Sequence, residues 1–227
     1  MAWVAFCLIP PRLDAQMIEP MLPSQATPAA PSTGQLTVGV NFNVAPSTAI
    51  TTGGYYSPRL EVRVPWLLVD HDLGSGWGLE AGYLYVAINL GSLNLPNESE
   101  NIVRLGATYA HSVDGFTFDN RALAEELFIH GGEPGEPSNT LHLRDRPRLT
   151  YHLNPQSPFA PRAYVYVEPT YDSHAGQLVR MDYSAGFGFR LMTRLTTDIF
   201  FIRETTPNLR GGDVNYFALQ LIFRLPN

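Results

Sequence analysis

Apolar and polar side chains alternate along most of this chain, from about residue 35 to its end. In the clearest stretch, 177–192, Val179 and Met181 begin an apolar series that interleaves with Arg180 and Asp182. A period of two is typical of a strand with one polar and one apolar face. Because this stretch is about twice as long as an ordinary globular strand, and its polar face carries full charges, the pattern indicates a barrel whose outer face meets lipid.

The same pattern predicts an all-β protein, an antiparallel up-and-down transmembrane-type β-barrel of about ten strands, with 10–12 possible. The expected strands lie at about residues 35–45, 57–69, 76–90, 100–112, 115–130, 140–153, 162–172, 177–192, 194–204 and 213–225. The segment Arg121–Ile129 has helix-favouring residues, but the tight entry at Asp114-Gly115 favours a hairpin strand there.

The connections between these strands alternate between longer, Gly/Pro-rich links and shorter ones. Exported barrels place long loops on the outer side and short turns on the periplasmic side. The alternation therefore favours a membrane barrel. An even count of ten strands predicts that the first strand begins, and the last strand ends, at the short-turn side.

Segment 140–153 carries the densest charge, with four basic residues on one face: His142, Arg144, Arg146 and Arg148. Its other face is rich in leucine. Guanidinium groups two residues apart repel one another unless carboxylates stand on neighbouring strands, and Glu125 and Glu168 supply such carboxylates. We predict that eleven residues line the lumen: Arg121, Glu125, His142, Arg144, Arg146, Arg148, Tyr164, Tyr166, Glu168, Arg180 and Asp182.

The charged residues assigned to the interior by this pattern give a surplus of positive charge. The ten basic residues are Arg59, Arg63, Arg104, Arg121, Arg144, Arg146, Arg148, Arg180, Arg190 and Arg224. The six acidic residues are Glu61, Glu80, Asp119, Glu125, Glu168 and Asp182. A barrel of this size is largely filled by its own side chains. We therefore expect a plugged lumen, or a narrow conduit that weakly favours anions.

Composition narrows the remaining classes. The chain has 227 residues with a net charge of −6, which argues against a nucleic-acid partner. It contains no stretch of eighteen apolar residues, so a membrane-spanning helix is not expected. The lone Cys7 excludes a disulfide framework and a cysteine metal site. No phosphate-binding loop or zinc spacing is present, and we expect no cofactor, no metal and no enzyme activity.

The first residues resemble the end of a secretory signal. An apolar run at Ala2–Ile9 is followed by Pro10-Pro11 and by a possible cleavage site after Ala15. We expect residues 1–16 to be a truncated signal peptide and 17–34 a disordered Pro/Ala-rich lead-in. Residues 35–227 then form the barrel domain.

Two other functions fit the pattern. A soluble exported sandwich or calyx would bind a small anion or a sugar through Tyr164 and Tyr166 beside the arginine row. An outer-membrane hydrolase would need a nucleophile next to a histidine, and its candidate bases are His71, His142, His152 and His174.

Several short motifs, in order, resemble a bacterial family of barrel proteins, domain of unknown function 2490 (DUF2490). They are WGLEAGYLYV at 77–86, ENIVR at 100–104, RALAEELF at 121–128, RDRPRLTY at 144–151, YVYVE at 164–168 and YFALQLIFRL at 216–225. The resemblance spans about residues 57–225. It implies a protein of the Gram-negative outer membrane, in contact with outer-membrane lipid and inserted by the barrel-assembly machinery, and it supplies no solute.

The resemblance also carries Arg121, Glu125, Arg148 and Glu168 over as interior positions. This chain departs from such barrels at its end, where Leu225 is followed by Pro226-Asn227 in place of a terminal aromatic residue. Three prolines inside predicted strands, Pro65, Pro147 and Pro169, are also unusual and suggest bulges or positions near a rim.

Overall fold

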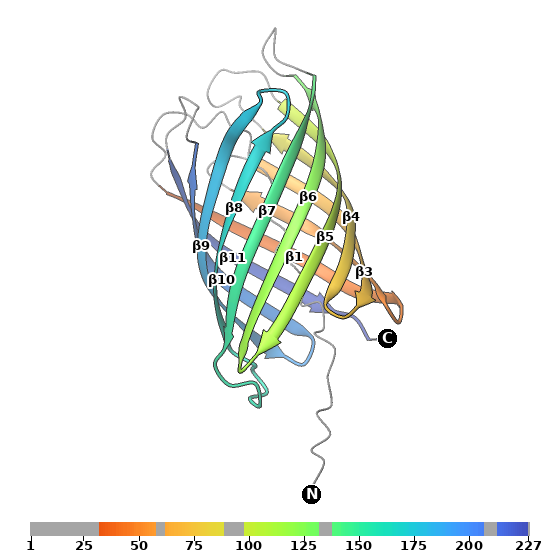
Figure 1. Cartoon of the computed structure of the whole chain (residues 1–227), viewed down its shortest axis with the longest axis vertical. Helices are drawn as coiled ribbons and strands as arrows, with labels where there is room; N and C mark the ends of the chain where they lie inside the picture. The colour runs from red at the N-terminus through yellow and green to blue at the C-terminus, as the bar shows by residue number, and fades with distance from the viewer. Residues whose placement is uncertain (1–31, 58–61, 89–97, 132–137, 207–212, 227) are drawn as a thin grey trace, which may run out of the picture.

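The computed structural model describes residues 32–57, 62–88, 98–131, 138–206 and 213–226, and these fold into a closed barrel of eleven strands (Figure 1). The strands are β1 (Thr33–Ala45), β2 (Thr48–Ser57), β3 (Val62–Gly74), β4 (Trp77–Ile88), β5 (Glu98–Val113), β6 (Phe116–His130), β7 (Asn139–His152), β8 (Arg162–Asp172), β9 (Gln177–Met192), β10 (Leu195–Thr205) and β11 (Val214–Arg224). The predicted all-β barrel is confirmed, with a strand count inside the expected range. In the described part of the chain, no helix is long and apolar enough to cross a bilayer.

Each strand pairs antiparallel with the next in sequence, and β1 closes the barrel by pairing in parallel with β11. The parallel seam runs from Thr33 opposite Tyr216 to Asn41 opposite Arg224. It follows from the odd count, because the eleventh strand of an up-and-down meander points the same way as the first. Thr33 and Arg224 therefore lie at opposite ends of the barrel. The expectation that they share an end is wrong, because the segment taken as the first long link contains β2.

The end of the barrel where β1, β3, β5 and β9 finish carries two-residue turns, and we call it the turn end. At Ser75-Gly76 the φ angles are 55° and 84°, and at Asp114-Gly115 they are 48° and 83°. Positive φ at both central residues is the geometry that matches the twist of a β-hairpin, and glycine adopts it without strain. The other end, where the four-residue link 173–176 joins β8 to β9, is called the loop end.

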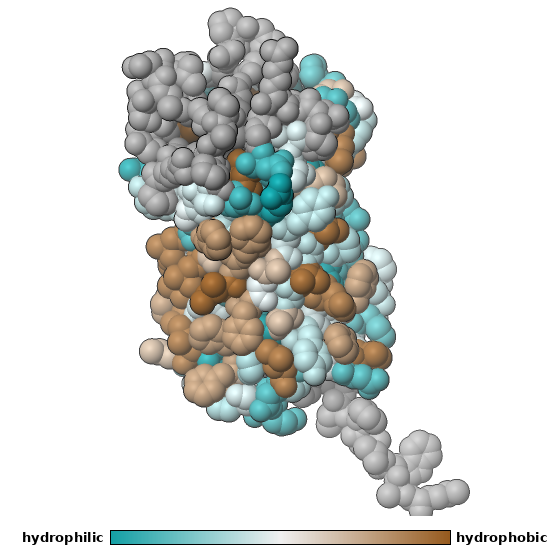
Figure 2. All heavy atoms as spheres, turned by 90° about the vertical axis from the view of Figure 1, so that its left-hand side faces the viewer, coloured by the Kyte–Doolittle hydropathy of each residue, from teal (hydrophilic) through white to brown (hydrophobic). Residues whose placement is uncertain are grey.

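Side chains alternate between a buried inner face and an exposed outer face along the strands. The outer face is apolar: Leu79, Leu105 and Val165 are each about half exposed (48, 64 and 53%). Figure 2 shows part of this surface, with brown side chains gathered over the middle of the barrel and paler residues among them. Ring pairs sit on it, with Trp77 and Tyr109 4.9 Å apart near the turn end.

Aromatic side chains gather toward both ends of the outer face. Those toward the turn end include Trp77, Tyr109, Phe116, Phe118, Tyr151 and Phe187, and those toward the loop end include Tyr56, Tyr85, Phe128, Tyr171 and Tyr183. Leucine, valine and alanine are common between the two sets, where Tyr83 and Phe201 also lie. Two aromatic girdles that flank an aliphatic band are typical of barrels that cross a bilayer.

The three strand prolines, Pro65, Pro147 and Pro169, lie within β3, β7 and β8. Pro65 pairs with Gly54 of β2, but the β3–β4 ladder has no pair at that position. The β7–β8 ladder likewise runs from Arg144 to Arg148 without a pair between them. A proline has no N–H to give to a ladder. A register shift between Thr170 and Tyr171 lies next to Pro169, so the expected bulge is found there. Around Pro65 and Pro147 the register does not shift, and one ladder is interrupted locally at each.

The interior contains an apolar layer that the sequence pattern did not reveal. It is formed mainly by β2, β3, β4, β10 and β11 and includes Tyr55, Val62, Val64, Trp66, Leu84, Val86, Phe200, Ile202, Tyr216 and Ile222. Together with the buried charged residues, this layer fills the barrel with the chain's own side chains.

Candidate functional site: a ring of ion pairs inside the barrel

Charged side chains from five consecutive strands, β4 to β8, converge inside the barrel. Glu80 lies on β4, Arg104 on β5, Glu125 on β6, Arg144 on β7 and Glu168 on β8. Each occupies an inward position of the period-two pattern, so strand geometry alone brings them to one wall. All of them are buried, and Arg104 and Glu168 have no exposed surface.

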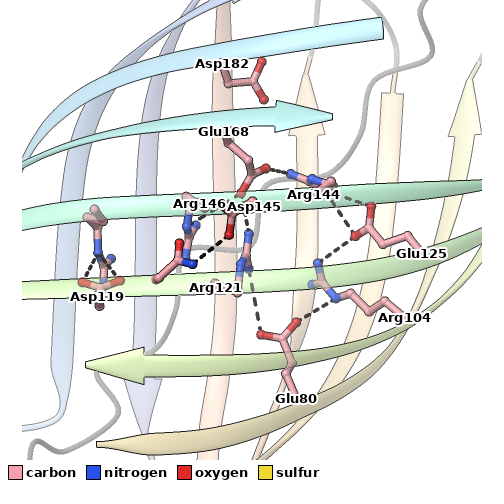
Figure 3. Close-up of polar contacts among 12 residues, drawn as sticks. Glu80, Arg104, Asp119, Arg121, Glu125, Arg144, Asp145, Arg146, Glu168 and Asp182 are labelled. Carbon is pink, nitrogen blue, oxygen red and sulfur yellow. Dashed lines mark hydrogen bonds and ion pairs between the residues drawn. The ribbon is translucent and has the colours of Figure 1, made fainter. Parts of the chain in front are cut away.

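Three glutamates and three arginines alternate around a closed ring: Glu80, Arg104, Glu125, Arg144, Glu168 and Arg121, which returns to Glu80 (Figure 3). Each arginine bridges two carboxylates and each carboxylate contacts two arginines. Opposite charges therefore alternate, which offsets the cost of removing them from water.

One half of the ring is held by Arg104 and Arg144. Arg104 Nε lies 3.0 Å from Glu80 Oε1, and Arg104 Nη1 donates a hydrogen bond of 3.3 Å to Glu125 Oε1. Arg144 Nη1 donates to both oxygens of Glu125, at 3.2 and 3.1 Å. Arg144 Nη2 donates to Glu168 Oε1.

Arg121 closes the other half. Its Nη2 donates a hydrogen bond of 3.1 Å to Glu168 Oε2, and its Nη1 lies 3.9 Å from Glu80 Oε2. A fourth guanidinium joins at Glu168, because Arg146 Nε lies 3.8 Å from Glu168 Oε2. The Arg146 guanidinium also stands over the Tyr166 ring, 5.4 Å from its centre, where the electron-rich face of the ring favours a cation.

A second buried group continues around the wall from β8. Arg180 Nη2 lies 3.1 Å from Asp182 Oδ2 on the same strand, and Arg180 Nη1 lies 3.9 Å from Glu204 Oε2 on β10. Glu168 and Asp182 are cross-strand partners in the β8–β9 ladder. The ring and this group therefore form one set of buried charged residues inside the barrel, carried by strands from β4 to β10.

Less buried ion pairs lie on the turn-end side of these buried charges. Arg148 Nε donates to Asp119 Oδ2 at 2.8 Å, with both side chains about 15% exposed (16 and 14%). Arg162 Nη2 donates to Asp198 Oδ1 at 3.0 Å. These pairs neutralise Arg148 and Arg162, whose side chains are 16% and 15% exposed.

His142 lies near the loop end of β7. Its Nε2 is 3.2 Å from Asp172 Oδ2, and the other oxygen of Asp172 accepts hydrogen bonds from Thr140 Oγ1 at 2.7 Å and from the backbone N–H of His174 at 2.7 Å. The carboxylate thus fixes the start of the β8–β9 link and orients the imidazole.

Tyr164 lies inside the barrel against Gly186 on β9. A Cβ at residue 186 would stand 2.3 Å from the Tyr164 ring, so only glycine leaves room for that ring. The predicted lumen residues thus share one face of β6–β9. Ten of them are buried, namely Arg121, Glu125, His142, Arg144, Arg146, Tyr164, Tyr166, Glu168, Arg180 and Asp182, while Arg148 is partly buried.

One assignment in the predicted charge count is wrong, because Arg63 is exposed on the outer face. Arg190 and Arg224 lie on the predicted inward side of their strands but are only half-buried. The predictions for Arg59 and Glu61 lie outside the described residues. In addition, the sequence pattern missed four buried acids: Asp70, Glu100, Asp198 and Glu204.

These corrections remove the predicted surplus of positive charge. Among the described residues, the buried arginines are Arg104, Arg121, Arg144, Arg146 and Arg180. The buried acids are Asp70, Glu80, Glu100, Glu125, Glu168, Asp182, Asp198 and Glu204. Eight acids against five arginines give no basis for an anion preference.

His71 and His152, also named as candidate bases, contact hydroxyl groups. His71 Nδ1 lies 2.9 Å from Thr48 Oγ1, and His152 Nε2 lies 3.0 Å from Thr117 Oγ1, in each case across a strand pair. His174 is exposed. In the described ranges, no three His, Cys, Asp or Glu side chains are grouped so as to hold a metal ion. The predicted signal segment 1–16, and residues 17–31 of the lead-in, lie outside the described residues.

Comparisons with known proteins add little beyond this architecture. No protein-family model and no curated protein matches the chain. Among solved structures, it is similar to "Outer-membrane expressed OmpT of Vibrio cholerae", with 10% sequence identity and a TM-score of 0.41. That match covers 70% of this chain and 51% of the other, so it spans about half the length of the Vibrio protein. The resemblance to DUF2490 stays a prediction.

Proposed function

We propose that this chain is an integral β-barrel of the bacterial outer membrane, with a lumen largely plugged by paired charges, and that it serves as a structural protein or a narrow conduit for small solutes. The observation that carries the proposal is the inverted polarity of the barrel. Arg104, Arg121 and Arg146 are at most 1% exposed, whereas Leu105 and Phe217 on the outer face are more than 60% exposed.

The outer surface supports a lipid environment. A soluble barrel would leave this apolar outer face in water. Large contiguous exposed apolar areas are rare on soluble proteins. A groove of about 710 Å³ adds to the apolar outer face across β9, β10, β11, β1 and β2. Its outward-facing walls include Leu36, Tyr56, Ile199, Phe201 and Phe217. Lipid acyl chains could fill this groove without removing polar groups from water, because its outward-facing walls are apolar.

The interior supports a plug or a narrow passage. Eleven strands widen a barrel only modestly beyond the eight that side chains can fill. The ring from Glu80 to Arg121 and the apolar layer around Trp66 together occupy this space. The proposal carries no anion preference, because the buried acids outnumber the buried arginines.

The odd strand number and the parallel seam distinguish the barrel from bacterial single-chain barrels, which have even counts. Hydrogen bonding does not require an even count. The β1–β11 pairs run without a break over nine residues, so the seam leaves no open edge toward lipid along that length.

The proposal is tested by cell fractionation followed by electrophoresis with and without heating. We expect the chain in the outer-membrane fraction, resistant to high-salt extraction and dependent on detergent, with a band that shifts on boiling. Purified protein in planar bilayers should give small conductance steps or none. Release by salt and solubility without detergent would instead support the soluble calyx, and recovery in the inner membrane would contradict the localisation.

A further inference from the structure

Asp145 is a carboxylate on the apolar outer face, at the middle of β7. Its inward neighbours in the chain, Arg144 and Arg146, are buried, whereas Asp145 itself is exposed. Leu143 and Leu149 on the same outer face are each 45% exposed. If the outer face is immersed in lipid, this carboxylate lies where a charge is costly. Polar residues at such positions usually have a partner.

One partner is Asn120 on β6, whose Nδ2 donates a hydrogen bond of 2.8 Å to Asp145 Oδ1 (Figure 3). The pair therefore presents a donor and an acceptor side by side. The Asn120 amide nitrogen carries two hydrogens, and this contact uses one of them. A carboxylate accepts several hydrogen bonds, and this contact supplies one of them.

A row of small residues runs beside the pair, between the larger Leu105 and Leu143, which lie on either side of Ala124. Ala122 lies directly opposite Asp145 in the β6–β7 ladder, and Ala107 lies opposite Ala122 in the β5–β6 ladder. Ala124 follows on the same outer face of β6. Pro147 is the next outward residue of β7. Small outward side chains allow another protein surface to approach closely, which strengthens dispersion contacts and short hydrogen bonds within a membrane.

The proline interruption coincides with this site. The β7–β8 ladder has no pair between Arg144 and Arg148, which is the stretch that contains Asp145. The sheet therefore has fewer internal hydrogen bonds at the same height as its exposed carboxylate. Lipid offers no hydrogen bonds to such groups, whereas a protein partner does.

We propose that the outer face of β5–β7 around Asp145 and Asn120 is the contact through which two copies of this chain associate in the membrane. A two-fold axis brings the same patch of both copies together, so each donor meets the other copy's acceptor. Asn120 of each copy donates its second amide hydrogen to Asp145 of the partner subunit. Each copy brings both a donor and an acceptor, so the patch of one copy can pair with the same patch of a second copy, which is the occupant we propose.

This inference rests on the proposed membrane function, and the test separates the two. The full chain with Cys7→Ser is reconstituted in vesicles of phosphatidylethanolamine and phosphatidylglycerol. Ala122→Cys places a thiol in the patch, and Ala185→Cys places a matched thiol on the outer face of β9. Both are treated with a short bis-maleimide, and the band shift on boiling is recorded to show that the barrel is intact.

We expect covalent dimers from Ala122→Cys and monomers from Ala185→Cys. Adding Asp145→Leu to Ala122→Cys should lower the dimer fraction about three- to tenfold, the effect of losing hydrogen bonds of membrane strength. Asp145→Asn, which keeps an acceptor, should lower it less. Equal cross-linking at both positions, no dimer from Ala122→Cys, or no effect of Asp145→Leu in heat-shifting barrels overturns the inference. Failure of the native chain to enter vesicles overturns the proposed function instead.

Discussion

Arg104 Nε lies 3.0 Å from Glu80 Oε1, and both side chains are fully excluded from solvent. The two residues are not directly opposite each other, because Arg104 of β5 is paired with Gly82 of β4, two residues beyond Glu80. A Cβ at residue 82 would come within 3.1 Å of Arg104 Nε and 2.3 Å of a Leu68 methyl group. The glycine therefore provides the space through which the guanidinium reaches Glu80, and the ring depends on a residue without charge.

Glu168 is the most connected carboxylate of the ring, and its neutralisation should destabilise the barrel. Glu168→Gln leaves the guanidinium groups of Arg121, Arg144 and Arg146 with one negative charge fewer. Breaking a buried ion pair typically costs about 3–5 kcal/mol. We expect a loss of that size in urea unfolding of the detergent-solubilised protein.

The matched control for Glu168→Gln is Asp213→Asn. It removes a carboxylate that pairs with Arg203 at the surface, where both side chains are about half exposed (45 and 52%). Exposed pairs contribute about 0–1 kcal/mol. Equal losses for the two variants would contradict the view that burial gives the ring its importance.

The contact between Tyr164 and Gly186 should be equally intolerant of added volume. Gly186→Ala places a methyl group within 2.3 Å of the Tyr164 ring, which then has to move. Overpacking of this kind costs about 1–3 kcal/mol. We expect a lower unfolding midpoint, recovered in part by adding Tyr164→Leu. A single variant as stable as the native chain would show that the ring has room to turn.

Much of this architecture can be predicted from the period-two pattern, because a closed barrel imposes that pattern on every strand. The pattern placed Glu125, Arg144 and Glu168 on one face. It could not give the contacts among them, since those depend on register between strands that are distant in sequence. The ion pair from Arg121 to Glu80 joins two strands that are not neighbours.

The missed strand has a specific cause. In β2, Gly53 and Gly54 suggest a loop by composition. In the barrel, a Cβ at Gly53 would lie 2.6 Å from the Trp66 indole and 2.2 Å from the Val38 carbonyl oxygen. The glycine is present for close packing beneath Trp66. A sequence read alone gives no information about the side chain that covers a glycine.

The wrong placement of Arg63 also has a physical reason. Around Pro65, both faces of β3 are apolar, with Val64 and Trp66 inside and Leu67 outside. Without alternation, the sequence does not specify which face is buried. The packing against neighbouring strands determines which face of β3 is buried. The indole of Trp66 fills the interior space that the glycines of β1 and β2 leave.

The outer face should reject charge in a way that depends on depth. Leu105 lies at the middle of β5 and is 64% exposed, and Val113 ends the same strand at 59% exposure. An arginine at the bilayer midplane of a barrel costs about 2–4 kcal/mol, and one near the interface about 0–1 kcal/mol. Leu105→Arg should therefore fold into vesicles much less stably than Val113→Arg. Equal stability of the two variants would argue for water around the barrel.

The ring should also limit conduction, which can be measured directly. Removing one arginine and one glutamate together, as in Arg144→Ala with Glu125→Ala, leaves the net charge unchanged and deletes one side of the ring. The remaining guanidinium groups of Arg104 and Arg121 still contact Glu80. We expect larger single-channel conductance in planar bilayers, because polar space that water can enter replaces paired side chains.

The control for this double variant is Arg203→Ala with Asp213→Ala, which deletes an exposed pair at the loop end without touching the ring. Its conductance should equal that of the native chain. Because Glu168 keeps Arg121 and Arg146 near it, the double variant should still show the native shift on boiling. Intact barrels whose conductance does not rise would place the constriction in the apolar layer around Trp66, and Trp66→Ala would then be the variant that opens the lumen.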